Sequence, residues 1–154
     1  MTSSLALLGL SLLAALSVAQ PENPGTAPRQ KRQYQVHCQV ILHQPNGKQQ
    51  LVMEPTLCVA DGRPAEYHSG GSTGDGKHFG TYFTCLVRCI DPTQVHLEAE
   101  AEWSKHIGGG KVETIVRFRC DQVVQPGTPI QFKQKDAKKP NQFYLATFWL
   151  QEMQ

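Results

Sequence analysis

A two-residue alternation of apolar and polar side chains runs through most of this chain and limits what it can fold into. From Gln33 onward, apolar side chains alternate with glutamine, histidine or charged ones in successive runs. This period is typical of β-strands that bury one face, because successive side chains of a strand point to opposite faces. No stretch after Gln33 has helical spacing. The pattern predicts an all-β fold, an antiparallel two-layer β-sandwich of about seven to nine strands.

Turn residues divide the alternating region into separate strands. Asn46-Gly47 favours a tight hairpin turn, because both residues tolerate a positive φ angle. The glycine-rich run 69–76 has too little side-chain volume to pack, and we expect a mobile loop there. The expected strands cover residues 33–43, 49–54, 56–60, 65–68, 80–90, 95–103, 112–120, 130–133 and 143–151.

Two of these strands carry complementary charges. An antiparallel pairing around the glycines that start at Gly108 places Glu98 and Glu100 near Arg117 and Arg119 on the wet face. A slip of one residue would bury these charges, so they are expected to fix the register of the pair.

Residues 1–19 have the features of a secretory signal peptide. A leucine- and alanine-rich run ends on Ser17-Val18-Ala19, a small-x-small site suited to signal peptidase. The run is too short to span a bilayer comfortably, which takes about 20 apolar residues. We therefore expect an exported protein, periplasmic or extracellular, without an integral membrane span once the signal is removed. Residues 20–32, rich in proline and glutamine, are expected to form a flexible leader, and residues 33–154 a single β domain.

The residues that carry chemistry are scattered and match no catalytic motif. The six histidines show no metal-ligand spacing, and there is no Gly-x-Ser-x-Gly elbow. The side chains of Glu98, Glu100 and Glu102 would point in parallel, about 6.6 Å apart, which disfavours a metal site. The formal charge is +2 and the chain has no dense basic block, so it lacks the positive patch that is typical of nucleic-acid-binding proteins. The sequence predicts a protein that is not an enzyme, with no catalytic residue, metal or cofactor.

Five cysteines follow the expected signal peptide. In an oxidising compartment an odd number leaves at least one thiol unpaired or linked between chains. Cys85 and Cys89 would lie on one strand about 13 Å apart, whereas the Cα atoms of a disulfide lie within roughly 7 Å. If a bridge forms, the candidate disulfide joins Cys85 or Cys89 to Cys120, between neighbouring strands. The alternative is that these cysteines are buried as small hydrophobic side chains.

The last expected strand, 143–151, is apolar on both faces. A strand of this kind is either buried or offers an edge to a partner. Phe143, Tyr144, Phe148 and Trp149 are therefore a candidate partner-binding edge.

Three parts of the chain share their order and character with one known family. Residues 53–67 form a proline-led strand, a glycine turn and a second strand; residues 80–87 and 95–101 form paired long strands; residues 124–130 lead towards a late turn. Together, over roughly residues 51–150, they resemble the β-domain of bacterial secretins, the outer-membrane channel subunits of type II and type III secretion and pilus systems. The resemblance implies a small secretin-like β-module in the envelope, without a catalytic site. The ring-forming domains that secretins place before this unit are not in the sequence, so we expect a module rather than a channel.

Three functions are compatible with these features. The leading hypothesis is an exported, non-enzymatic envelope module that binds an envelope protein or itself, by edge-strand addition or self-association. The first alternative is a small-ligand or glycan binder that uses Tyr67, Tyr82, Trp103 or Trp149 as stacking surfaces. The second alternative is a hydrolase with a dispersed site.

Overall fold

The computed structural model describes residues 32–154 and contains nine β-strands within them. The expected signal peptide, and the leader except for Arg32, lie outside the described residues. No helix in the described part is long and apolar enough to cross a membrane. The strands are β1 (Gln33–His43), β2 (Gln49–Met53), β3 (Thr56–Ala60), β4 (Pro64–Ser72), β5 (His78–Cys89), β6 (Val95–His106), β7 (Val112–Val124), β8 (Ile130–Lys135) and β9 (Phe143–Met153).

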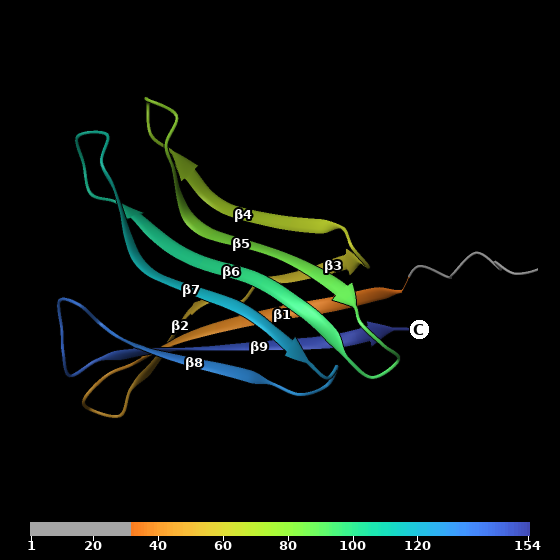
Figure 1. Ribbon diagram of the computed structural model, residues 1–154. Coiled ribbons are helices and arrows are strands. Elements are labelled where there is room, and N and C mark those ends of the chain that lie inside the picture. The colour runs from red at the N-terminus through yellow and green to blue at the C-terminus, as the bar shows by residue number, and fades with distance from the viewer. Residues whose placement is uncertain (1–31) are drawn as a thin grey trace, which may run out of the picture.

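The strands form two antiparallel sheets that pack face to face (Figure 1). Sheet A has the strand order β2-β1-β9-β8, and β3 also pairs with β1. Sheet B has the order β4-β5-β6-β7. This arrangement confirms the expected all-β, antiparallel two-layer sandwich, and the nine strands fall within the expected number.

The core lies between the inner faces of the two sheets. Phe83 of β5 meets Phe148 of β9 across the sandwich, with ring centroids 6.3 Å apart. Phe148 also contacts Phe132 of β8, at a centroid distance of 5.9 Å. Burying each large apolar side chain stabilises the fold by roughly 1.5–3 kcal/mol. The other large side chains that are fully buried are Tyr34, Val36, Cys38, Val40, Val59, Cys85, Val87, Val95, Leu97 and Val116.

Strand β1 changes partner along its length. Its first half pairs with β3 and its second half with β2. The register shifts between Val40 and Ile41, and Ile41 is also the residue that interrupts the alternation in the sequence. Pro55 lies between β2 and β3, where its carbonyl oxygen accepts a hydrogen bond of 3.0 Å from the N–H of Cys38. This bond holds the link between β2 and β3 against β1, and with it the neighbouring Glu54.

The glycine-rich run 69–76 is half strand rather than loop. β4 continues through Ser72, and only the turn 73–77 follows, closed by a backbone hydrogen bond of 2.8 Å between its end residues. The expectation of a loop was therefore wrong for the first half of the run. Gly70 and Gly80 face each other with φ angles of +145° and +119°, and a Cβ on either would lie 2.0 or 2.1 Å from a backbone oxygen of the other strand. Two glycines let the backbones approach this closely, which extends the hairpin.

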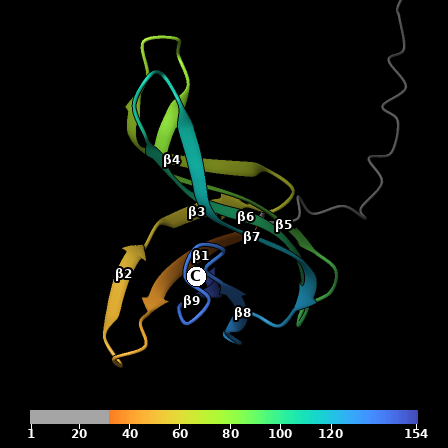
Figure 2. The ribbon, with the colours of Figure 1, turned by 90° about the vertical axis from the view of Figure 1, so that its left-hand side faces the viewer.

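The tips of the β4–β5 and β6–β7 hairpins bend away from sheet A, as two views of the ribbon show (Figures 1 and 2). Their tips lie close together, because a Cβ on Gly110 would be 3.8 Å from the carboxylate of Asp75. The hydroxyl of Thr73 donates to Asp75, and the ammonium of Lys77 lies 2.9 Å from the same carboxylate. The hydrogen bond from Thr73, followed by that from Lys77, lowers the pKa of Asp75. The two hairpin tips of sheet B therefore project beyond the sandwich, and local contacts hold them in place.

We expect Gly80→Ala to destabilise the protein by about 1–3 kcal/mol. The added methyl group would strain the backbone at this positive φ angle and would clash with the backbone of the opposite strand. The control is Gly74→Ala in the same hairpin, where a Cβ meets nothing within 4 Å and no positive φ angle is required. This variant should unfold at the same urea concentration as the parent, or slightly higher. Equal urea midpoints for the two variants would show that the Gly70–Gly80 contact does not constrain the hairpin.

Candidate functional site

The candidate partner-binding edge on β9 is not an edge in the structure. β9 is hydrogen-bonded to β1 along its whole length, and to β8 from Phe143 to Phe148. The expectation of an edge was therefore wrong, because a strand with two apolar faces can equally be an interior strand of a sheet. The four residues also separate by face. Tyr144 and Phe148 point into the core, whereas Phe143 and Trp149 lie half-buried on the outer face of sheet A.

The long free edges belong to sheet B. β4 and β7 each pair with a single strand of the described part of the chain. β4 is 9 residues long and β7 is 13 residues long. An edge strand presents backbone N–H and C=O groups on its open side, and these can pair with a strand of another chain. The edges of sheet B are therefore candidate sites for strand addition.

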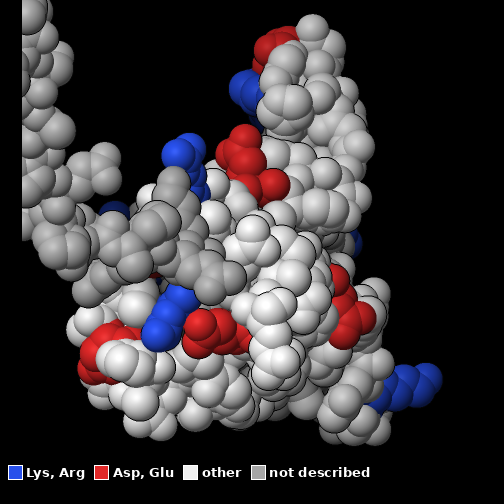
Figure 3. Space-filling model, turned by 90° about the vertical axis from the view of Figure 1, so that its right-hand side faces the viewer, with Lys and Arg blue, Asp and Glu red and all other residues white. Residues whose placement is uncertain are grey.

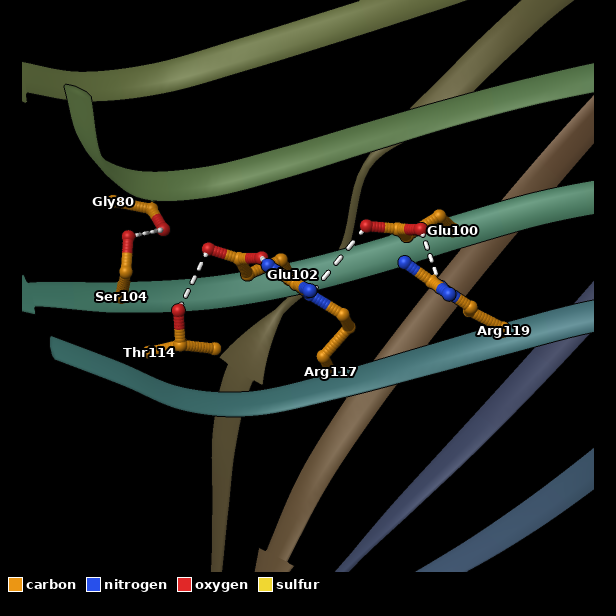
Figure 4. Close-up of polar contacts among 7 residues, drawn as sticks. All are labelled: Gly80, Glu100, Glu102, Ser104, Thr114, Arg117 and Arg119. Carbon is orange, nitrogen blue, oxygen red and sulfur yellow. Dashed lines mark hydrogen bonds and ion pairs between the residues drawn. The ribbon is translucent and has the colours of Figure 1, made fainter. Parts of the chain in front are cut away.

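The outer face of sheet B carries a ladder of ion pairs between β6 and β7 (Figure 4). Arg119 donates from Nε to Glu100 at 2.7 Å, and Arg117 donates from Nε to Glu102 at 2.6 Å. Arg117 also lies 3.4 Å from Glu100. The hydrogen bond and the charge of Glu102 raise the pKa of Arg117. Exposed pairs of this kind contribute about 0.2–1 kcal/mol each, so their main effect is to fix the register.

The ladder agrees in part with the arrangement expected from the sequence. Glu100 does face Arg117 and Arg119 across the two strands. Glu98 does not join them, because its carboxylate pairs with Arg88 on the other neighbouring strand and lies 3.5 Å from His96. β6 has a partner on both sides, and each of its glutamates can therefore pair in either direction.

Charged side chains are dispersed over the surface elsewhere. The face of the molecule shown in Figure 3 has basic and acidic groups in small separate patches, with uncharged surface between them. Among residues 32–154, no three His, Cys, Asp or Glu side chains come together in a way that could hold a metal ion.

A polar groove crosses the outer face of sheet A. It has a volume of about 550 Å³ and is lined by Gln35, His37, Gln39, Glu54, Thr56, Trp149 and Gln151. His37 contacts two other lining residues: its Nδ1 atom is 2.7 Å from the hydroxyl of Thr56, and its Nε2 atom is 3.4 Å from the carboxylate of Glu54. Gln39 donates to Glu54 at 2.7 Å. The imidazole of His37 packs against the indole of Trp149, with ring centroids 5.1 Å apart.

Of the residues that line this groove, only Trp149 was a candidate binding residue in the sequence. The other lining residues occupy polar positions in strands whose side chains alternate between apolar and polar. The sequence alone predicts that such positions face solvent, but not which of them lie together. The one available signal is that the polar positions of β1 are glutamine and histidine rather than charged residues.

The other aromatic candidates lie elsewhere. Tyr67 is 39% exposed on β4, and the ring of Tyr82 stands 4.5 Å from that of His68. Trp103 packs against the core on sheet B, with the ammonium of Lys105 4.4 Å from its ring centre. The structure therefore does not bring the four aromatic candidates into one site.

The candidate disulfide does not fit the fold. Cys85 on β5 and Cys120 on β7 both face Ala99 of β6, so an entire strand lies between them. Two strand spacings amount to about 9.6 Å, more than a disulfide can bridge. Cys89 lies four positions farther along β5. The pairing of Cys85 or Cys89 with Cys120 was therefore wrong, and all five cysteines are free thiols in the structure.

Burial suppresses the reactivity of three of these thiols. Loss of solvation raises the pKa of Cys85 to about 12 and that of Cys120 to about 11. The pKa of Cys38 is raised further, by burial and then by the nearby Cys85. Cys58, in contrast, is exposed on β3. Only the thiolate attacks a disulfide reagent. The buried thiols are therefore protected twice, because the reagent cannot reach them and because they remain protonated.

We expect Ellman's reagent at pH 8 to modify Cys58 rapidly, and Cys38, Cys85 and Cys120 only when guanidinium unfolds the protein. The measurement is the time course of thiol release, and a Cys58→Ser variant should lose the fast phase. Release from the three buried thiols at the rate of Cys58, or an intact mass lower by two hydrogens after oxidation of the folded monomer, would contradict this arrangement.

Comparison with known proteins identifies the fold. No protein-family model and no curated protein sequence matches the chain. The chain resembles the secretin InvG of the Salmonella SPI-1 type III secretion injectisome, with a TM-score of 0.58 and 11% identity over 80% of this chain and 65% of that chain.

Two further solved structures give the same result. ExeD of Aeromonas hydrophila matches with a TM-score of 0.52 and 11% identity over 79% of this chain and 46% of that chain. The type II secretion system secretin GspD of E. coli K12 matches with a TM-score of 0.52 and 9% identity, over 80% and 48% respectively. The secretin resemblance is thus confirmed as a likeness of fold, and the chain spans less than two thirds of the length of each matched protein.

Proposed function

We propose that the protein is an exported, non-enzymatic envelope module that associates with further copies of itself through the free edges of sheet B. A secretin-like fold supports this function. The basal body that contains InvG also contains PrgH and PrgK, so that protein functions within a larger assembly. A partner from the envelope that adds a strand to the same edges is the related alternative.

The observation that carries the proposal is the pair of long edges on one four-stranded sheet. Neighbouring strands of sheet B run antiparallel, so β4 and β7 run in opposite directions. β4 of one copy can therefore add to β7 of the next copy and continue the antiparallel pattern. Such a contact joins two different surfaces, and repetition gives either a closed ring or an open filament.

The charges along the edges support one register for this contact. Cross-strand pairing places Glu66, Thr84, Glu100 and Arg119 in one row across sheet B. If the next copy continues this row, Arg119 on β7 faces Glu66 on the β4 strand of that copy. Arg119 would then lie between two carboxylates, its own Glu100 and the neighbouring Glu66. Opposite charges directly across a strand pair are favourable, and like charges are unfavourable.

Size-exclusion chromatography with light scattering on residues 20–154 tests the proposal. We expect a defined oligomer, with and without reductant, because backbone hydrogen bonds rather than disulfides would join the copies. A strict monomer that also captures no protein from an envelope extract would exclude the proposed function. Dissociation by reductant alone would assign the association to an exposed thiol instead of the sheet edges.

Charge reversal tests the register. Glu66→Arg should raise the dissociation constant of the oligomer by about tenfold, because it places a cation opposite Arg119. Adding Arg119→Glu to the same chain should restore part of the association, since the pair between copies is then reversed, although the new carboxylate also faces Glu100 of its own chain. Glu54→Arg makes the same change of charge on sheet A and should leave association unchanged. Equal losses for Glu66→Arg and Glu54→Arg would mean that net charge, rather than this contact, sets the affinity.

A further inference from the structure

The polar groove on the outer face of sheet A is a second site, separate from the edges of sheet B. Its seven lining residues come from β1, β3, β9 and the link between β2 and β3. Its volume of about 550 Å³ falls within the range of roughly 300–1,000 Å³ that is typical of small-ligand sites. The assembly proposed above gives these residues no role.

The fold holds the groove's polar groups in place. The change of partner along β1 leaves room for the Glu54-Pro55 link, and the bond between Cys38 and Pro55 fixes that link against the strand. Glu54 then accepts a hydrogen bond from Gln39, and its carboxylate faces His37. Side chains that neighbours already orient lose less conformational entropy when they bind a ligand.

The lining residues define the chemistry of the ligand. Three glutamines, one threonine and one histidine offer both donors and acceptors, and Glu54 is the single charged residue among the seven. A strongly cationic or anionic ligand would find little compensating charge here. The indole of Trp149 adds a flat apolar surface beside these groups, half-buried on the sheet. A pyranose ring has the complementary character, with an apolar C–H face and a rim of hydroxyl groups.

We propose that this groove binds a neutral oligosaccharide, with Trp149 as the stacking surface and the glutamine amides as partners for the sugar hydroxyls. Gln35 and Gln151 face each other across β1 and β9, at the exposed end of the groove, and are placed to contact the ligand directly. At the inner end, Gln39 is hydrogen-bonded to Glu54, and the Glu54 carboxylate lies 3.4 Å from His37. The site binds and does not hydrolyse, because glycoside hydrolysis uses a pair of carboxyl groups and the groove is lined by one.

Tryptophan fluorescence tests the proposal, because the chain contains only two tryptophans. In a Trp103→Phe variant, Trp149 is the single indole and reports on the groove alone. We expect maltotetraose, cellotetraose or chitotetraose to produce a saturable change in its emission. The reciprocal variant, Trp149→Phe, retains Trp103 and should show no change. Isothermal titration calorimetry on the unaltered chain gives the same answer without either substitution.

A pair of glutamine variants locates the contact. Gln151→Ala should weaken binding of the responding sugar by about tenfold, a loss typical of one or two hydrogen bonds. Gln122→Ala makes the same change on an exposed position of β7 in sheet B and should bind normally. Circular dichroism on both variants verifies the fold.

Two results would overturn the proposal. One is the lack of a saturable response to all three sugars at concentrations up to about 10 mM with folded protein. The other is a response to tetramethylammonium chloride without a response to sugar, which would identify a cation site formed by Trp149 and Glu54. Light scattering on the same samples reports on assembly separately, so the loss of one proposal does not decide the other.

Discussion

The packing of Phe148 on sheet A against Phe83 on sheet B holds the two layers together, and the positions of the other surfaces depend on it. Because Phe148 must face the core, β9 presents Trp149 on the opposite, outer face. Within sheet A, β9 is an interior strand, flanked by β1 and β8. Its backbone is thereby occupied, and among residues 32–154 the long free edges belong to β4 and β7 of sheet B.

The two proposed sites use different properties of a sheet. Strand addition to β4 or β7 depends on backbone N–H and C=O groups, and side chains such as Glu66 and Arg119 only select the register. The groove on sheet A depends on side chains alone, which β1, β3 and β9 bring together by pairing. The first site therefore requires an open edge, whereas the second requires strands that are fully paired. One sandwich can accommodate both because they lie on different sheets.

Local patterns in the sequence predicted the strands well where one face is apolar and a turn residue follows. The hairpin at Asn46-Gly47 and the strand from Thr56 to Ala60 occur as expected, since both depend on neighbouring residues only. The predictions that required strand order were less successful. The bridge to Cys120 was wrong because β6 lies between its ends, and no local pattern states how many strands separate two cysteines.

By itself, the sequence determined that this chain forms strands, which face of each strand is apolar, and where the tight turns lie. These properties follow from the period of the side chains and from the φ angles that glycine and asparagine allow. Only the tertiary structure decided which strands are neighbours, and therefore which edges are free. It also decided that His37, Glu54 and Trp149 share one groove, because hydrogen bonding between strands brings together residues that are far apart in the chain.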